Sequence, residues 1–101
     1  MRFTKPEATF FVPDGRPPAE ALARTTHLAV GAHQDDIEIM AFHGILSCFR
    51  RPGRGFAAVT CTNGAGSPRA GLYAGCSDAV MMAIRHAEQD EAARIGQYAF
   101  M

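Results

Sequence analysis

An imidazole and three carboxylates fall within six consecutive residues of this chain, at His33, Asp35, Asp36 and Glu38. An apolar run at 28–32, of the kind that fills a buried strand, precedes them. Acids this close together repel one another and lose hydration where a strand meets a helix, so positive charge must offset them. Neutral imidazole and carboxylate oxygen are both normal zinc ligands. The cluster therefore predicts a divalent metal site.

The spacing within the cluster predicts a division of roles. His33 lies in the loop, and Asp36, three residues on at the start of a helix, turns back towards the same point, so both are expected metal ligands. Asp35 lies between them and is the expected catalytic base, because a carboxylate beside a metal-activated water can take its proton as it attacks a carbonyl. Glu38 either orients His33 or complements the positive end of the helix dipole, and both interpretations stay open.

The other histidines do not complete the site. His43 follows Asp36 by seven residues, which on a helix displaces it by roughly 10 Å along the axis. His27 precedes the strand and lies at its wrong end, and His86 flanks the polar side of a later helix. Catalytic zinc sites normally have three protein ligands, so a third ligand is missing from these residues.

Hydrophobic patterning predicts the elements that position the cluster. Buried strands are expected at 28–32 and 56–61, a helix from Asp35 or Asp36 to near Phe49, and a second helix from Ser77 or Asp78 to about Gly96. A long glycine-rich loop at 62–76 lies between the second strand and second helix, and 98–101 resembles the start of a third strand. The first helix is predicted to carry on one side the apolar residues Ile37, Met40, Ala41, Ile45 and Leu46. The apolar side of the second helix is predicted to comprise Val80, Met81, Ala83, Ile84, Ala87, Ala92 and Ile95.

This alternation predicts an α/β fold, a Rossmann-like parallel sheet with flanking helices. Two strands and part of a third do not fill such a sheet, so we expect the fold to be incomplete in this chain. Residues 1–26 are an irregular lead-in, with a short edge strand or packing arm at 9–12, and 27–101 form the N-terminal part of a single domain. Because ligands bind at the carboxyl ends of parallel strands, 33–36 and 62–66 are expected to face one another.

Charge gives no sign of a nucleic-acid partner. The ten basic and ten acidic side chains balance, whereas nucleic-acid binding usually needs a basic stripe. Arg50, Arg51 and Arg54 do cluster around Pro52 and Gly53, and a solvated turn is the favoured interpretation over a phosphate site.

The sequence predicts neither a targeting or membrane segment nor a set of paired cysteines. No signal peptide and no apolar run of about 20 residues is present, so a transmembrane segment is not expected and the expected location is the cytoplasm. Cys48, Cys61 and Cys76 lack CxxC spacing, which argues against a disulfide framework or a thiolate cluster. Cys48 and Cys61 are expected to be buried free thiols. The sequence does not decide whether the chain forms a homo-oligomer.

Three blocks of the chain are similar to one family. The segment AHQDDIEI at 32–39 resembles the AHPDDxE signature of the LmbE/PIG-L family of zinc-dependent N-acetylglucosaminyl deacetylases. VTCTNG at 59–64 resembles the family's second strand and its following turn, and RHAE at 85–88, with Ala92 and Gly96, resembles its RxxE helix. The resemblance covers roughly 27–98. In three places the chain departs from the pattern: Gln34 replaces a proline, Met40, Phe42 and His43 replace glycines, and the downstream histidine ligand is absent.

The resemblance implies a hydrolase that removes an acetyl group from an N-acetyl amino-sugar conjugate. Carried over, His33 and Asp36 would bind zinc or another divalent metal, Asp35 would be the general base, and Arg85 would hold the sugar. With two of three ligands, the 101 residues alone are expected to be inactive. The alternative is a non-catalytic or degenerate metal-binding fragment that needs a partner segment to complete its sheet and site.

Overall fold

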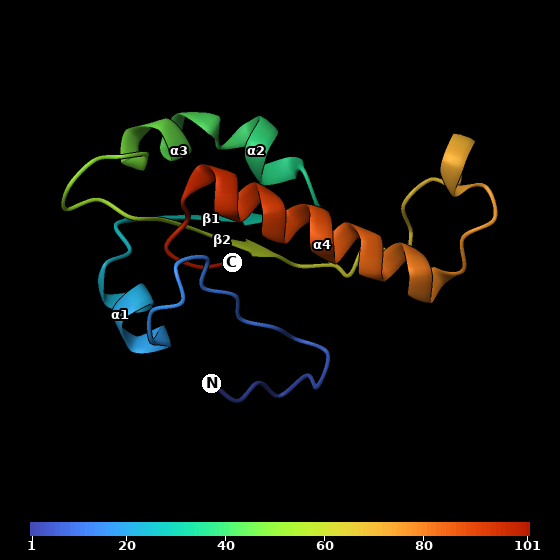
Figure 1. Ribbon diagram of the computed structural model, residues 1–101, viewed down its shortest axis with the longest axis horizontal. Helices are drawn as coiled ribbons and strands as arrows, with labels where there is room; N and C mark the ends of the chain where they lie inside the picture. The colour runs from blue at the N-terminus through green and yellow to red at the C-terminus, as the bar shows by residue number, and fades with distance from the viewer.

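Two parallel strands, β1 (His27–Gly31) and β2 (Phe56–Thr60), form the sheet of the structure, a computed structural model that describes residues 1–101. They pair in register, from His27 opposite Phe56 to Gly31 opposite Thr60. The other elements are α1 (Pro18–Ala23), α2 (Asp36–Met40), α3 (Phe42–Cys48), the short 3-10 helix η1 (Gly71–Tyr73) and α4 (Asp78–Gly96). The predicted α/β class is confirmed as a two-stranded parallel sheet with four α-helices (Figure 1).

The segment that follows α4 begins to pair with β2. Phe100 forms a parallel bridge with Ala57, and its carbonyl accepts a hydrogen bond of 3.1 Å from the Ala58 N–H. Met101 exchanges two backbone hydrogen bonds, of 2.7 and 2.8 Å, with Phe11 of the lead-in. The expected strand-like pairing at 98–101 is present, and residues 9–12 act as an arm that packs against it.

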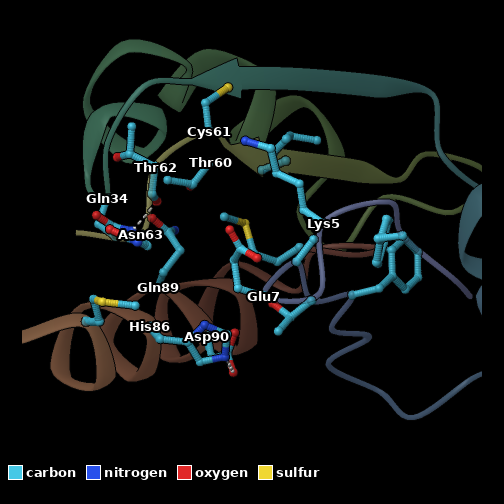
Figure 2. A pocket seen from close by; sticks show the side chains of 18 of the residues that line it. Lys5, Glu7, Gln34, Thr60, Cys61, Thr62, Asn63, His86, Gln89 and Asp90 are labelled. Atoms are coloured by element: carbon cyan, nitrogen blue, oxygen red, sulfur yellow. Dashed lines mark hydrogen bonds and ion pairs between the residues drawn. The ribbon is translucent and has the colours of Figure 1, made fainter. Parts of the chain in front are cut away.

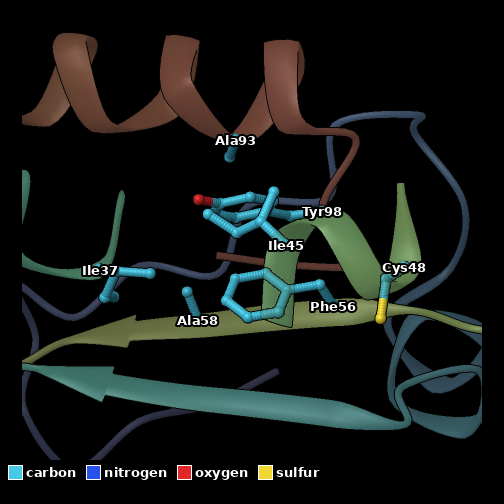
Figure 3. Packing of buried hydrophobic residues seen from close by; sticks show 7 residues of the cluster. All are labelled: Ile37, Ile45, Cys48, Phe56, Ala58, Ala93 and Tyr98. Atoms are coloured by element: carbon cyan, nitrogen blue, oxygen red, sulfur yellow. The ribbon is translucent and has the colours of Figure 1, made fainter. Parts of the chain in front are cut away.

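The larger core lies between the sheet and the helices on one of its faces. Phe56 and Ala58 alternate with Ala57 along β2, so their side chains point to this face. The rings of Phe56 and Tyr98 meet edge to face with centroids 4.8 Å apart, an arrangement that aromatic pairs prefer. Figure 3 shows these rings between α4 and the strands, in a cluster of Ile37, Ile45, Cys48, Phe56, Ala58, Ala93 and Tyr98.

A smaller core covers part of the opposite face. Ala21 of α1, Ala57, Ala99 and Phe100 are buried there. Phe10 stacks on the ring of Phe100 at 4.8 Å, so the lead-in is held by packing although it contains no strand.

The helix predicted from the cluster to Phe49 is broken. Ala41 leaves helical geometry, with φ −108° and ψ 19°, and separates α2 from α3. The break means that α2 and α3 do not share one continuous apolar face. Ile37 and Ile45 are buried as expected, whereas Met40 and Leu46 are mainly exposed, so their predicted place in the core is wrong.

Helix α4 has the predicted bounds but buries another side. Ser77 caps it, accepting a 3.2 Å hydrogen bond from the N–H of Val80, and Gln97 ends it in the left-handed conformation. The predicted apolar side is wrong at four exposed residues, Val80, Ala83, Ala87 and Ile95, whereas Gln89 is buried. The residues turned towards the rest of the molecule recur every fourth position, at Met81, Arg85, Gln89 and Ala93. No helix in the structure is long and apolar enough to cross a membrane.

The three cysteines are free thiols, as expected. Cys48 is buried in the larger core, and Cys76 is half-buried. Cys61 is exposed, so its predicted burial is wrong; it follows the last residue of β2, where the covered part of the strand has ended.

Candidate functional site

The loop after β1 brings His33 and Asp36 together. The His33 N–H donates a 3.0 Å hydrogen bond to Oδ2 of Asp36, and the His33 Nδ1 atom lies 3.4 Å from the same oxygen. The side chain of His33 is 69% exposed and that of Asp36 31% exposed, so both are open to a solute. An imidazole nitrogen and a carboxylate oxygen thus lie side by side at the carboxyl end of β1.

The Asp35 side chain is hydrogen-bonded to Arg85 of α4, not to His33 or Asp36. Asp35 adopts the left-handed conformation with φ 75°, which Asp tolerates better than most residues. Its Oδ2 atom accepts a 2.5 Å hydrogen bond from Arg85, and its own N–H donates at 3.3 Å to the buried side chain of Gln89. Arg85 also pairs with Glu88. The hydrogen bond to Asp35 is the main cause that raises the pKa of Arg85, with the charges of both carboxylates adding to it.

Glu38 forms no hydrogen bond with His33; its partners are Gln89 of α4 and Tyr98. Its Oε1 atom accepts hydrogen bonds from Gln89 at 2.9 Å and from the Tyr98 hydroxyl at 2.6 Å. Burial raises the pKa of Tyr98, and the hydrogen bond to Glu38 raises it further. Gln89 therefore links the backbone of Asp35 to Glu38, and this network fixes the start of α2 against α4.

The loop after β2 lies against the loop after β1, as expected for two loops that both follow the carboxyl ends of parallel strands. Thr62 donates through its N–H and its hydroxyl to the Ala32 carbonyl, at 3.1 and 2.8 Å. The buried Gln34 side chain donates to the Thr62 carbonyl at 2.9 Å. Gly64 then passes so close to Arg85 that a Cβ there would lie 2.6 Å from Cβ of Arg85.

Replacement of Gly64 by Ala is expected to lower the free energy of unfolding by about 1–3 kcal/mol. Gly64 has φ +81°, and the atoms that a new Cβ would meet belong to the base of the Arg85 side chain, which cannot swing away. Urea unfolding measures the change. Gly66→Ala is the matched control, since a Cβ there meets nothing within 4 Å; equal losses in both variants would contradict the close packing of Gly64 on Arg85.

A cavity of about 1050 Å³ adjoins this site along β2, α4 and the lead-in. Figure 2 shows Gln34, Thr62 and Asn63 on one side, His86 and Asp90 on α4, and Lys5 on the opposite side. The hydroxyl of Thr60, which lines the cavity, is buried without a hydrogen-bond partner. Of the residues from 33 to 38, only Gln34 lines it, so the His33–Asp36 pair lies beside the cavity rather than in it.

No third candidate ligand joins His33 and Asp36. No group of three His, Cys, Asp or Glu side chains gathers anywhere in the structure. His43 is exposed on α3, His27 begins β1 at the other end of the strand, and His86 pairs with Asp90 at 3.4 Å.

Sequence reasoning missed Gln89, and it assigned Arg85 to a sugar rather than to Asp35. Gln89 lies in line with Met81, Arg85 and Ala93 at four-residue spacing, but nothing in the sequence marks this line as the buried side of α4. Nothing in the sequence signals the ion pair of Asp35 with Arg85, because fifty residues separate them.

Comparisons of the chain with protein-family models, with curated proteins and with solved structures find no match. What the site can do chemically therefore follows from its own atoms. It offers a paired imidazole and carboxylate, a second carboxylate held by a guanidinium group, and beside them a large, mainly apolar cavity that carries several polar groups.

Proposed function

We propose that this chain carries part of a zinc-dependent hydrolase that removes the acetyl group from an N-acetyl amino-sugar conjugate. The single observation that carries the proposal is the approach of His33 Nδ1 to Asp36 Oδ2. Asp35, which lies between them in the sequence, is held by Arg85. The AHQDDIEI segment, which resembles the deacetylase signature, supplies all three residues.

The two donor atoms suit a zinc ion. Zinc takes imidazole nitrogen and carboxylate oxygen at about 2.0–2.2 Å in tetrahedral geometry, which places neighbouring donors roughly 3.3–3.6 Å apart. The observed 3.4 Å separation falls in that interval, and both side chains are accessible. His33 and Asp36 would hold the ion. Bound there, zinc would polarise the acetyl carbonyl and favour ionisation of water.

Asp35 is suited to move the proton. Its Oδ2 atom is engaged by Arg85, while Oδ1 makes no hydrogen bond within the protein and is the atom left to hold a water. The Arg85 contact fixes the direction of the carboxylate, and the N–H of Asp35 is tied to Gln89. In this proposal Arg85 positions the base.

The cavity beside the pair is suited to the sugar. More than half of its lining residues are hydrophobic, which suits the faces of a sugar ring and an acetyl methyl group. The others offer hydroxyl, amide, imidazole and carboxylate groups, which match the donors and acceptors of sugar hydroxyls.

A specific observation favours a second candidate function. Only two donors gather at the site, whereas catalytic zinc sites use three, so a metal-binding module without catalysis fits the same residues. The two candidates separate on hydrolysis: the enzyme releases acetate once a third ligand is supplied by another segment, and the module does not.

Metal titration of the chain tests the donor pair that both candidates share. His33→Ala and Asp36→Asn are each expected to weaken zinc binding by about 10- to 100-fold or more, since even the loss of a group that only orients a ligand has an effect of this size. Competition with a chromophoric zinc chelator measures the affinity. His43→Ala is the matched control, an exposed histidine nearby that should leave the affinity unchanged. Equal weakening in all three variants would remove the assignment.

A further inference from the structure

A second hollow, of about 670 Å³, lies at the amino ends of the two strands, away from the site described above. Five arginines line it, which is half of the ten basic side chains of the chain. Asp14 is the one carboxylate in the lining. The arginines precede β1, precede β2 or lie near the end of α4, and Figure 1 shows the loop that leads into β2 at the end of the molecule opposite to the 61–77 loop. They are Arg24, Arg50, Arg51, Arg54 and Arg94.

A tight turn brings the backbones of Arg51 and Arg54 close together. Pro52 and Gly53 occupy its centre, Gly53 has φ +74°, and the Arg54 N–H donates to the Arg51 carbonyl at 3.3 Å. The ends of such a turn lie within about 7 Å of each other. Proline and glycine in these places are the residues that the turn requires.

Three of the five arginines have no acidic partner. Arg24 pairs with Asp14, and Arg94 pairs with Glu91 at 3.1 Å. Arg50, Arg51 and Arg54 form no ion pair in the structure; Arg50 lies over the ring of Phe49 instead. In addition, Nε of Arg24 is buried without a hydrogen-bond partner. The hollow therefore holds an excess of positive charge in a chain whose formal net charge is zero.

Helix ends account for only part of this charge. α3 and α4 both end near the hollow, and basic side chains stabilise the negative ends of helices. Arg54 does donate to the Ser47 carbonyl of α3, at 3.3 Å. Arg50 and Arg51 make no such hydrogen bond, and clustered like charges disfavour one another unless an anion is present. Both arginines are exposed, so their guanidinium groups are free to meet an anion.

We propose that this hollow binds a small molecule through a phosphate or diphosphate group. Guanidinium groups match phosphate oxygens with two parallel hydrogen bonds, and three unpaired guanidinium groups suit the charge of a phosphomonoester or diphosphate. The volume suits a metabolite-sized ligand. The hollow is concave, and acidic side chains outnumber basic ones in the rest of the chain, because the hollow takes five of the ten basic residues and only one of the ten acidic ones. Both features favour a small ligand over a nucleic acid or an anionic membrane surface.

Isothermal titration calorimetry of the 101-residue chain with pyrophosphate, in 50 mM salt, tests the proposal. Saturable binding of about one pyrophosphate per chain is expected. The double variant Arg51→Gln/Arg54→Gln should weaken it at least tenfold, and Arg51→Gln alone, which removes no hydrogen bond within the protein, at least threefold. The matched control Arg2→Gln/Lys5→Gln removes the same charge outside the hollow and should change the affinity less than twofold.

Two further probes separate the sources of phosphate. A twelve-residue oligothymidylate and vesicles that contain one third phosphatidylserine should bind more weakly than pyrophosphate. Tighter binding of either one, lost in the Arg51→Gln/Arg54→Gln variant, would overturn the small-ligand assignment. Absence of saturable pyrophosphate binding, or equal weakening by the control variant, would overturn the site itself. None of these outcomes bears on zinc or acetate release, which concern the other end of the sheet.

Discussion

Replacement of Asp35 by Asn is expected to lower acetate release from an N-acetyl amino-sugar conjugate by about 10²–10⁴-fold in the proposed enzyme, once a third zinc ligand is supplied. Asparagine keeps the volume and the hydrogen bond to Arg85 but cannot take a proton from water. It also tolerates the left-handed conformation that residue 35 adopts, so the loop should keep its shape. Because the proposed ligands are His33 and Asp36, zinc content should be unchanged. A discontinuous acetate assay, together with metal analysis of the purified variant, measures both quantities.

Glu88→Gln is the matched control for this variant. Glu88 is the other carboxylate that pairs with Arg85, and it approaches neither His33 nor Asp36. Its replacement should change the rate less than threefold if Arg85 is held mainly by Asp35. Full activity of Asp35→Asn would contradict the role of base, and loss of zinc from that variant would show that Asp35 is a ligand instead.

The elements of this fold that local signals specify could be predicted from the sequence. The two apolar runs became β1 and β2 within one residue at each end, since a short run of small and branched side chains suits a buried parallel strand. Ser77 was a predicted cap and is the cap of α4, because its hydroxyl satisfies an N–H that the helix leaves free. These features depend on a few neighbouring residues.

The break at Ala41 and the orientation of α4 could not be predicted in this way. Both depend on what the helix faces: α4 buries Gln89 because the backbone of Asp35 and the carboxylate of Glu38 lie opposite. An apolar stripe along the sequence of α4 gives no sign of that, since a buried polar side chain is stable only where partners from distant segments meet it. Packing between distant segments therefore overrode the local pattern.

The candidate site also has one feature that local sequence predicts and one that it does not. The approach of His33 to Asp36 follows from three-residue spacing at the start of a helix, and the structure brings these two together. The partner of Asp35 does not follow from spacing, because Arg85 reaches it only when α4 packs across the carboxyl end of the sheet. Local geometry thus predicted that His33 and Asp36 lie together, and only the folded chain revealed what holds the carboxylate of Asp35.

Tyr98 joins the core to the network behind Asp35, and Tyr98→Ala is expected to lower the free energy of unfolding by about 3–5 kcal/mol. The ring is 2% exposed and packs on Phe56, so its removal leaves a cavity. Tyr98→Phe keeps the ring and removes only the hydrogen bond to Glu38, at a cost of about 1–2 kcal/mol. Urea unfolding at neutral pH measures both, and equal losses would contradict the separate contribution of the ring.

The hydroxyl of Tyr98 also predicts a dependence on pH. Burial and the hydrogen bond to Glu38 raise the pKa of Tyr98 above that of the unfolded chain, near 10. The unfolded state therefore loses its proton first as the pH rises, so the stability from this group is complete below about pH 10 and declines above it, by at most about 1.4 kcal/mol per pH unit. Tyr98→Phe should remove this alkaline decline. Tyr73→Phe, at the other and more exposed tyrosine, should leave it intact, and the reverse result would show that Tyr98 is not the residue responsible.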